Sequence, residues 1–187
     1  MRPRAAVDAP RVVKSVRVGE MLISSSACPP EALEEALHNQ SFFGGRLGTN
    51  LLQMGAIQER QLVAALARLH RVRGVSGELA PEPDAVALVS RSFVERYEVV
   101  PCAVVERSLR LVMRDPGDLE AIDEIAFATG RKIERVVAAE ARVWSLMRRH
   151  YGVERKLRGI DDAWPRWAPR IERGRGSVQP IAVNVWR

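Results

Sequence analysis

The sequence has few of the residues that specialised binding and catalytic sites commonly use. It holds only two cysteines, Cys28 and Cys102, and neither belongs to a CxxC or Cys/His spacing. This excludes the usual zinc motifs and a disulfide framework. Aromatic residues make up only 5% of the chain, so the core must be aliphatic, and we expect both cysteines to be buried free thiols.

Long apolar segments are also absent. No apolar run approaches the length of about 18 residues that a transmembrane helix needs. The N-terminal residues lack the continuous apolar segment of a signal peptide. We therefore expect a soluble, cytoplasmic protein without a membrane span.

The motifs of common catalytic sites are missing as well. The chain contains no GxxxxGK[ST] loop, no GxSxG, no HExxH and no GxGxxG after a strand. The three histidines, His38, His70 and His150, lie near expected helix C-termini, where a cationic side chain interacts favourably with the helix dipole. We expect neither enzymatic activity, nor a bound metal, nor a cofactor.

Positive charge is concentrated at the two ends of the chain. The formal net charge is +6, and only three of the 29 cationic residues are lysines. Residues 1–14 carry four basic groups and one acid, and residues 151–187 carry eight and four, so the part between them is nearly neutral. A nucleic-acid partner would require basic residues clustered within the fold, and we do not expect one.

The first half of the chain is expected to be helical. Apolar residues recur at helical spacing in four segments, at about 16–25, 31–39, 47–54 and 59–70. Pro29-Pro30 separates the first two segments, and Phe42-Phe43-Gly44-Gly45 is the expected joint before the third. Gly55 is placed to end the third helix in the left-handed conformation. Ser26 holds the equivalent place after the first helix, where a left-handed backbone would cost roughly 1 kcal/mol.

The second half mixes helices and strands. Residues 71–84 are rich in turn formers and mark a boundary between subdomains. The pattern after them predicts a helix, a two-strand hairpin, a helix with its N-cap near Asp118, a third strand and a terminal helix, at 86–97, 99–105 with 109–113, up to 129, 133–137 and 140–151.

The predicted fold class is therefore α+β. A four-helix tandem-repeat subdomain at 15–72 packs on a small α/β subdomain with a short sheet at 85–151. Residues 1–14 are expected to form a flexible leader, and residues 152–187 a basic, disordered tail that includes three of the four tryptophans.

The strongest pattern is a segment that occurs twice, with matching positions 29 residues apart. The first copy opens with Arg17-Val18-Gly19 and closes with Leu33, Leu37 and Gln40; the second opens with Arg46-Leu47-Gly48 and closes with Leu62, Leu66 and Leu69. Arginine binds phosphate bidentately and stacks on purines, glycine lets the backbone approach a ligand closely, and leucines four apart offer an apolar floor. Two copies suit a ligand with two equivalent ends.

These residues carry a specific resemblance. The pattern R-[LV]-G-x-x-L-[LI]-x-x-[GS]-x-x-x-x-x-x-L-x-x-x-L-x-x-[QL], at 17–40 and 46–69, resembles the MshEN domain, a family of N-terminal domains of type II secretion and type IV pilus assembly ATPases. The later strings Tyr-Glu-Val-Val-Pro and Met-Arg-Asp-Pro-Gly-Asp are similar to the C-terminal half of that family, so the resemblance covers about residues 15–151. Because the chain ends without an ATPase domain, we expect a stand-alone domain that is not a secretion motor.

The resemblance implies a receptor for cyclic di-GMP that signals ligand occupancy to an unidentified protein partner. Each copy of the motif would take one guanine half of the ligand. The implied ligand-binding residues are Arg17, Val18, Gly19, Leu33, Leu37, Gln40, Arg46, Leu47, Gly48, Leu62 and Leu66, with Asp115 as a weaker candidate.

The chain departs from the family pattern in each copy. Ser26 replaces a glycine in the first, and Leu69 replaces the final glutamine of the second. A lost hydrogen bond typically costs about 0.5–1.5 kcal/mol, so we expect weakened but retained binding. The same departures favour an alternative function: a protein–protein docking adaptor of a secretion or pilus system that binds no nucleotide.

Overall fold

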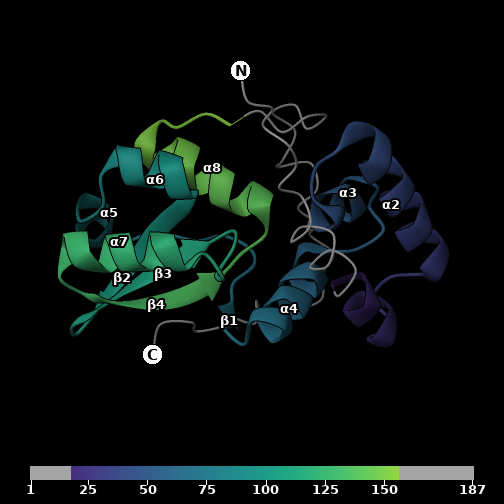
Figure 1. Ribbon diagram of the computed structural model, residues 1–187, viewed down its shortest axis with the longest axis horizontal. Helices are drawn as coiled ribbons and strands as arrows, with labels where there is room; N and C mark the ends of the chain where they lie inside the picture. The colour runs from purple at the N-terminus through teal and green to yellow at the C-terminus, as the bar shows by residue number, and fades with distance from the viewer. Residues whose placement is uncertain (1–17, 156–187) are drawn as a thin grey trace, which may run out of the picture.

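The computed structural model describes residues 18–155, shown in colour in Figure 1. The expected leader at 1–14 and Arg17 lie outside the described residues, as does the expected tail at 152–187 except for residues 152–155, where Gly152 caps α8 and Val153 is buried. The described part is a helical N-terminal half that packs beside a half built on a small sheet. The domain boundaries expected from the sequence, at 72 and 85, remain a prediction.

The N-terminal half is helical throughout. A helix at residues 18–24 precedes α2 (Pro30–Phe43), α3 (Leu47–Gln53) and α4 (Glu59–His70). Pro30 occupies the first turn of α2, where its missing N–H costs no hydrogen bond. The expected joint at 42–45 is too long, because both phenylalanines continue α2 and only the glycines, at φ 73° and 84°, leave the helical region.

Two equivalent loops follow the first and third helical segments. Ser26 adopts φ 53° and Gly55 adopts φ 69°, so the serine does take the left-handed conformation. The backbone hydrogen bonds also match: Ala27 N donates to Leu22 O at 2.8 Å, and Ala56 N donates to Leu51 O at 3.0 Å. The loop after the first helix therefore has the same geometry as the loop after the third, at the cost of backbone strain at Ser26.

The second half contains a four-stranded sheet in the order β1-β4-β3-β2, formed by β1 (Arg73–Gly74), β2 (Val99–Val105), β3 (Ser108–Met113) and β4 (Lys132–Val137). Strands β2 and β3 form the expected antiparallel hairpin, while β3 and β4 run parallel. The turn-rich segment 71–84 also contains a strand that the sequence did not indicate, because β1 pairs in parallel with the end of β4. Two residues show no periodicity, so only their tertiary partners make them a strand.

Four helices accompany the sheet: α5 (Pro83–Ala87), α6 (Arg91–Tyr97), α7 (Leu119–Thr129) and α8 (Glu140–Tyr151). The single helix expected at 86–97 is wrong. The chain forms α5 and α6 instead, because Ser90 takes an extended conformation at φ −68° and ψ 155° and starts a new helix. The Asp118 side chain caps α7 by accepting from Ala121 N at 3.0 Å, and Gly130 ends it at φ 63°.

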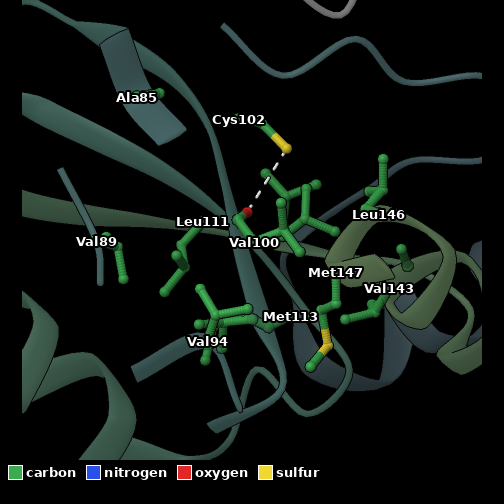
Figure 2. Close-up of a cluster of buried hydrophobic side chains, with 14 of the residues drawn as sticks. Ala85, Val89, Val94, Val100, Cys102, Leu111, Met113, Val143, Leu146 and Met147 are labelled. Carbon is green, nitrogen blue, oxygen red and sulfur yellow. Dashed lines mark hydrogen bonds between the residues drawn. The ribbon is translucent and has the colours of Figure 1, made fainter. Parts of the chain in front are cut away.

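The buried side chains form two clusters. The larger lies in the sheet half, where Val100, Leu111 and Met113 of the strands meet side chains of α8, among them Val143 and Met147 (Figure 2). The smaller lies among the helices of the N-terminal half and includes Ala139, the N-cap residue of α8. Each half thus has its own aliphatic core.

Strand β1 and an ion pair join the two halves. A Cβ at Gly74 would lie 2.6 Å from Val63 Cγ1 of α4, so strand and helix are in direct contact. Nearby, Arg142 of α8 donates from Nε and Nη2 to the two carboxylate oxygens of Glu59, at 2.9 and 2.7 Å. This bidentate pair is partly buried and restricts the orientation of α4 relative to α8.

Candidate functional site

A cavity of about 330 Å³ lies where the N-terminal half meets the end of the sheet. This volume is within the range of small-molecule sites. Its lining comes from the helical half on one side and from residues after β3, after β4 and in α8 on the other: Val18, Gln40, Gly45, Arg46, Leu47, Gly48, Thr49, Leu62, Leu66, Leu69, His70, Arg114, Asp115, Ala138, Glu140 and Trp144.

Arg46 stands at the junction of the two halves. It is the N-cap residue of α3, in an extended conformation at φ −99° and ψ 141°. Its Nη1 donates to the Arg114 carbonyl at 3.1 Å, so a residue from after β3 helps to hold the guanidinium. The arginine of the second motif is thereby placed at the cavity wall, where a guanidinium can bind an anion or stack on a base.

The apolar floor of the cavity comes from α4. Leu62 is buried, and Leu66 and Leu69 are partly buried. All three line the cavity, because they fall on one face of the helix. Leu62 also fixes the spacing between helices, since a Cβ on Gly48 would lie 2.6 Å from Leu62 Cδ1.

The first copy contributes less to this cavity. Val18 and Gln40 line it, and Gln40 Nε2 donates to the Gly45 carbonyl at 2.8 Å. Gly19, Leu33 and Leu37 do not line it.

These three residues have other surroundings. A Cβ on Gly19 would lie 2.9 Å from Leu33 Cδ1, which repeats the packing of Gly48 on Leu62, while Leu37 is 37% exposed. Arg17 lies outside the described residues. The residues expected in one ligand site thus fall into two groups, of which only one shares the cavity.

Charged side chains of the sheet half face the second motif across the cavity. Glu140, at the start of α8, accepts from Thr49 Oγ1 at 2.8 Å and from Arg114 Nη1 at 3.2 Å. Arg114 Nη1 also lies 2.7 Å from a carboxylate oxygen of Glu98. The buried Glu140 carboxylate is therefore compensated by a hydroxyl and a guanidinium.

Asp115 joins the same wall. It lines the cavity directly after Arg114, and its Oδ1 accepts from Gly117 N at 3.0 Å. That bond ties the carboxylate to the turn after β3. An acidic group beside two arginines can accept from donor groups of a ligand, while the arginines bind its acceptors.

The motif pattern did not indicate several lining residues. These are Thr49, His70, Arg114, Ala138, Glu140 and Trp144. A signal existed for Arg114, a charged residue directly after an apolar strand. Nothing in the sequence pairs Glu140 with Thr49, since 91 positions separate them.

Residues 18–155 offer no metal centre, since they contain no cluster of three or more His, Cys, Asp or Glu side chains that could hold an ion. None of the helices in that part of the chain has the length and apolar character needed to cross a membrane. The cavity is therefore the principal candidate for a small-molecule site among the described residues.

The fold is that of a small α+β domain, and comparison with known proteins shows which family it resembles. The MshEN domain model matches residues 76–157. This match confirms the resemblance to the MshEN domain that the sequence indicated.

Among curated proteins, the chain is similar to the type IV pilus assembly ATPase PilB of Myxococcus xanthus, with 34% identity over 138 residues. It is also 34% identical over 148 residues to PilB of Thermus thermophilus. The alignments cover 73% and 77% of this chain but only 24% and 16% of those proteins. The chain thus spans a quarter or less of the length of these relatives.

Among solved structures, the chain resembles MshE with cdg (cyclic di-GMP), at 28% identity and a TM-score of 0.56, over 72% of this chain and 99% of that one. The N-terminal domain of XpsE matches at 24% identity and a TM-score of 0.54, over 81% of this chain and all of that one. The likeness to XpsE supports the fold alone.

Proposed function

We propose that this chain is a cyclic di-GMP receptor module that binds the ligand through its tandem motifs and signals occupancy to a partner protein. The observation that carries the proposal is the composition of the cavity. It unites Arg46, Leu47, Gly48, Leu62 and Leu66 of the second motif with Gln40 of the first and Asp115 of the sheet half. The likeness to MshE with cyclic di-GMP gives independent support.

The chemistry of the lining suits a guanine nucleotide. A guanidinium can pair with a phosphate oxygen and stack on a purine, and the leucines of α4 provide an apolar surface under a flat base. A carboxylate such as that of Asp115 accepts hydrogen bonds from the N–H groups of guanine. We propose a binding function rather than catalysis, and the cytoplasmic location expected from the sequence stays a prediction.

In this proposal, residues 15–72 form a tandem repeat with two half-sites of unequal quality. The repeated contacts of Gly19 with Leu33 and of Gly48 with Leu62 support the equivalence of the two copies. Their inequality follows from Leu69, which lines the cavity where the family pattern has a glutamine.

Titration calorimetry of the full chain with cyclic di-GMP tests the proposal. We expect micromolar or tighter binding, and a rise in melting temperature, because a ligand that binds only the folded state stabilises it. Arg46→Ala should weaken binding strongly. The matched control is Arg96→Ala, which removes an exposed arginine whose ion-pair partner, Glu120, lies outside the cavity lining. Absence of heat and of a melting shift at high protein concentration would refute the proposal.

A second function is favoured by exposed apolar side chains on α2. Phe42 and Phe43 are 70% and 72% exposed at its C-terminal end. Exposed apolar side chains of this kind occur at protein contact sites. Together with the similarity to PilB, they support the alternative function, a docking adaptor of a pilus or secretion system. An unchanged melting temperature with cyclic di-GMP, together with partner binding that Phe42→Ser abolishes, would favour the adaptor.

A further inference from the structure

Arg114 is a second arginine in the cavity, and it comes from the other half of the molecule. It follows Met113, the last residue of β3, while Arg46 precedes α3. The two residues touch, because Arg46 Nη1 donates to the Arg114 carbonyl at 3.1 Å. Both line the cavity, so its wall presents a guanidinium from each half.

The hydrogen-bonding groups of Arg114 are only partly used. Its contacts to Glu98 and Glu140 are made through Nη1, at 2.7 and 3.2 Å. A guanidinium has five N–H donors, and within residues 18–155 the Nε and Nη2 of Arg114 donate no hydrogen bond. Neither nitrogen is among the buried polar atoms without a partner in that part of the chain, so neither is fully buried.

The side chains of Arg114, Glu98 and Glu140 differ in their exposure to solvent. The Arg114 side chain is 28% exposed, while those of Glu98 and Glu140 are 13% and 8% exposed. The two carboxylates therefore bind Nη1 of the guanidinium on its more buried side. The remaining edge, with Nε and Nη2, has the fork geometry that binds two oxygens of a phosphate.

We propose that Arg114 is a phosphate-binding residue of the cavity, contacting a phosphodiester group of the ligand from the sheet half while Arg46 acts from the motif half. This inference rests on the proposed function, because it assigns a ligand contact to the same cavity. It adds a charged ligand contact from the sheet half beside the second copy of the motif, where Leu69 supplies no hydrogen bond.

The carboxylates compete with the ligand for Arg114. A phosphate that pairs with the guanidinium approaches a cluster already containing two negative charges, which lowers its affinity. Glu98→Gln removes one of those charges and leaves Arg114 in place. Replacement of Arg114 should therefore lower the ligand affinity, whereas replacement of Glu98 should raise it. Loss of a purely structural ion pair would not produce these opposite changes.

The test is calorimetric titration of the full chain and its variants with cyclic di-GMP, and with pyrophosphate as an anion without a base. For wild type we expect binding of both. Arg114→Gln should weaken cyclic di-GMP binding roughly tenfold or more, the scale of a hydrogen bond to a charged group. Glu98→Gln should tighten it by about two- to fivefold.

Arg114→Gln leaves Glu140 buried without its cation and can lower stability. The double variant Arg114→Gln/Glu140→Gln removes both charges and should show the same loss of affinity with normal folding by circular dichroism. Arg96→Gln is the matched control and should leave affinity unchanged, since its ion pair with Glu120 is exposed.

The outcomes distinguish the phosphate-binding role of Arg114 from the proposed receptor function. If wild type binds cyclic di-GMP and both Arg114 variants bind equally well, the inference is wrong and the receptor function stands. If cyclic di-GMP fails to bind but pyrophosphate binds and requires Arg114, the inference stands and the receptor function falls. If neither probe binds, both are refuted.

Discussion

Gly48 and Leu62 pack so closely that a Cβ on residue 48 would lie 2.6 Å from Leu62 Cδ1 and 3.3 Å from Leu62 Cγ. Real Cβ atoms do not approach that closely, so a larger residue at 48 must displace the leucine. Leu62 is buried and lines the cavity. The same contact therefore determines both the distance between α3 and α4 and the position of the cavity floor.

Gly48→Ala should lower the free energy of unfolding by roughly 1–3 kcal/mol, the usual cost of overpacking. Gly19→Ala should cost less, because its contact, Leu33, is only partly buried and is free to shift. Urea denaturation measures both. Equal stability of Gly48→Ala and wild type would show that Leu62 moves aside without strain.

Ser26→Gly should stabilise the protein by about 1 kcal/mol. Ser26 adopts φ 53°, a region that costs a residue with a side chain roughly that amount. Glycine already occupies the equivalent place at position 55. Gly55→Ala, which instead adds a side chain at the equivalent position, should lower the stability. Urea denaturation of both variants measures these opposite changes in the free energy of unfolding. A loss of stability in Ser26→Gly would mean that the flexibility of glycine in the unfolded chain outweighs the strain.

Leu69→Gln should tighten cyclic di-GMP binding. Leu69 lines the cavity at the place where the first motif has Gln40, and one added hydrogen bond contributes about 0.5–1.5 kcal/mol. Calorimetry should therefore show an affinity gain of about two- to tenfold. The control is Leu69→Met, which keeps the apolar volume. No gain over that control would show that residue 69 does not contact the base.

The stability of the protein should fall at alkaline pH because of a buried thiol. Burial raises the pKa of Cys102 to about 12, with the Glu82 carboxylate adding to the shift. A cysteine in the unfolded chain has its ordinary pKa of 9.0. The folded state therefore binds the proton more tightly, and the stability it contributes is full below pH 9 and is lost as the pH rises towards 12.

Urea denaturation at increasing pH measures this loss, and Cys102→Ala should reduce its slope above pH 9 relative to wild type. A thiol reagent at pH 8 should react with Cys102 only after unfolding, since the thiolate is the reactive form. Rapid modification of Cys102 in the folded protein would contradict its burial.

Elements with strong local signals could be predicted from the sequence. The limits expected for α4 and α8 agree with the structure, because each has a regular apolar face and a clear end. The hairpin of β2 and β3 was predictable from two largely apolar runs around a short turn. Elements without such signals were missed, among them β1, which exists only because β4 lies beside it.

The candidate site was predictable only in part. The repeat identified Arg46, Leu47, Gly48, Leu62 and Leu66, which do share the cavity. It also suggested equal use of Leu33 and Leu37, which lie outside that cavity. A motif specifies side-chain chemistry at regular spacing, but it does not specify which copy of the motif faces another part of the molecule.

The sequence by itself determined the chemistry of this protein: an aliphatic core, no recognised catalytic motif, and two arginine-glycine-leucine segments spaced 29 residues apart. These properties depend on residue types and local periodicity. The tertiary structure alone decided that the second segment forms a cavity with the sheet half, and that Arg114 and Glu140 stand across from it. Glu140 meets Thr49 across 91 residues, and only the packing of the two halves brings such distant residues together.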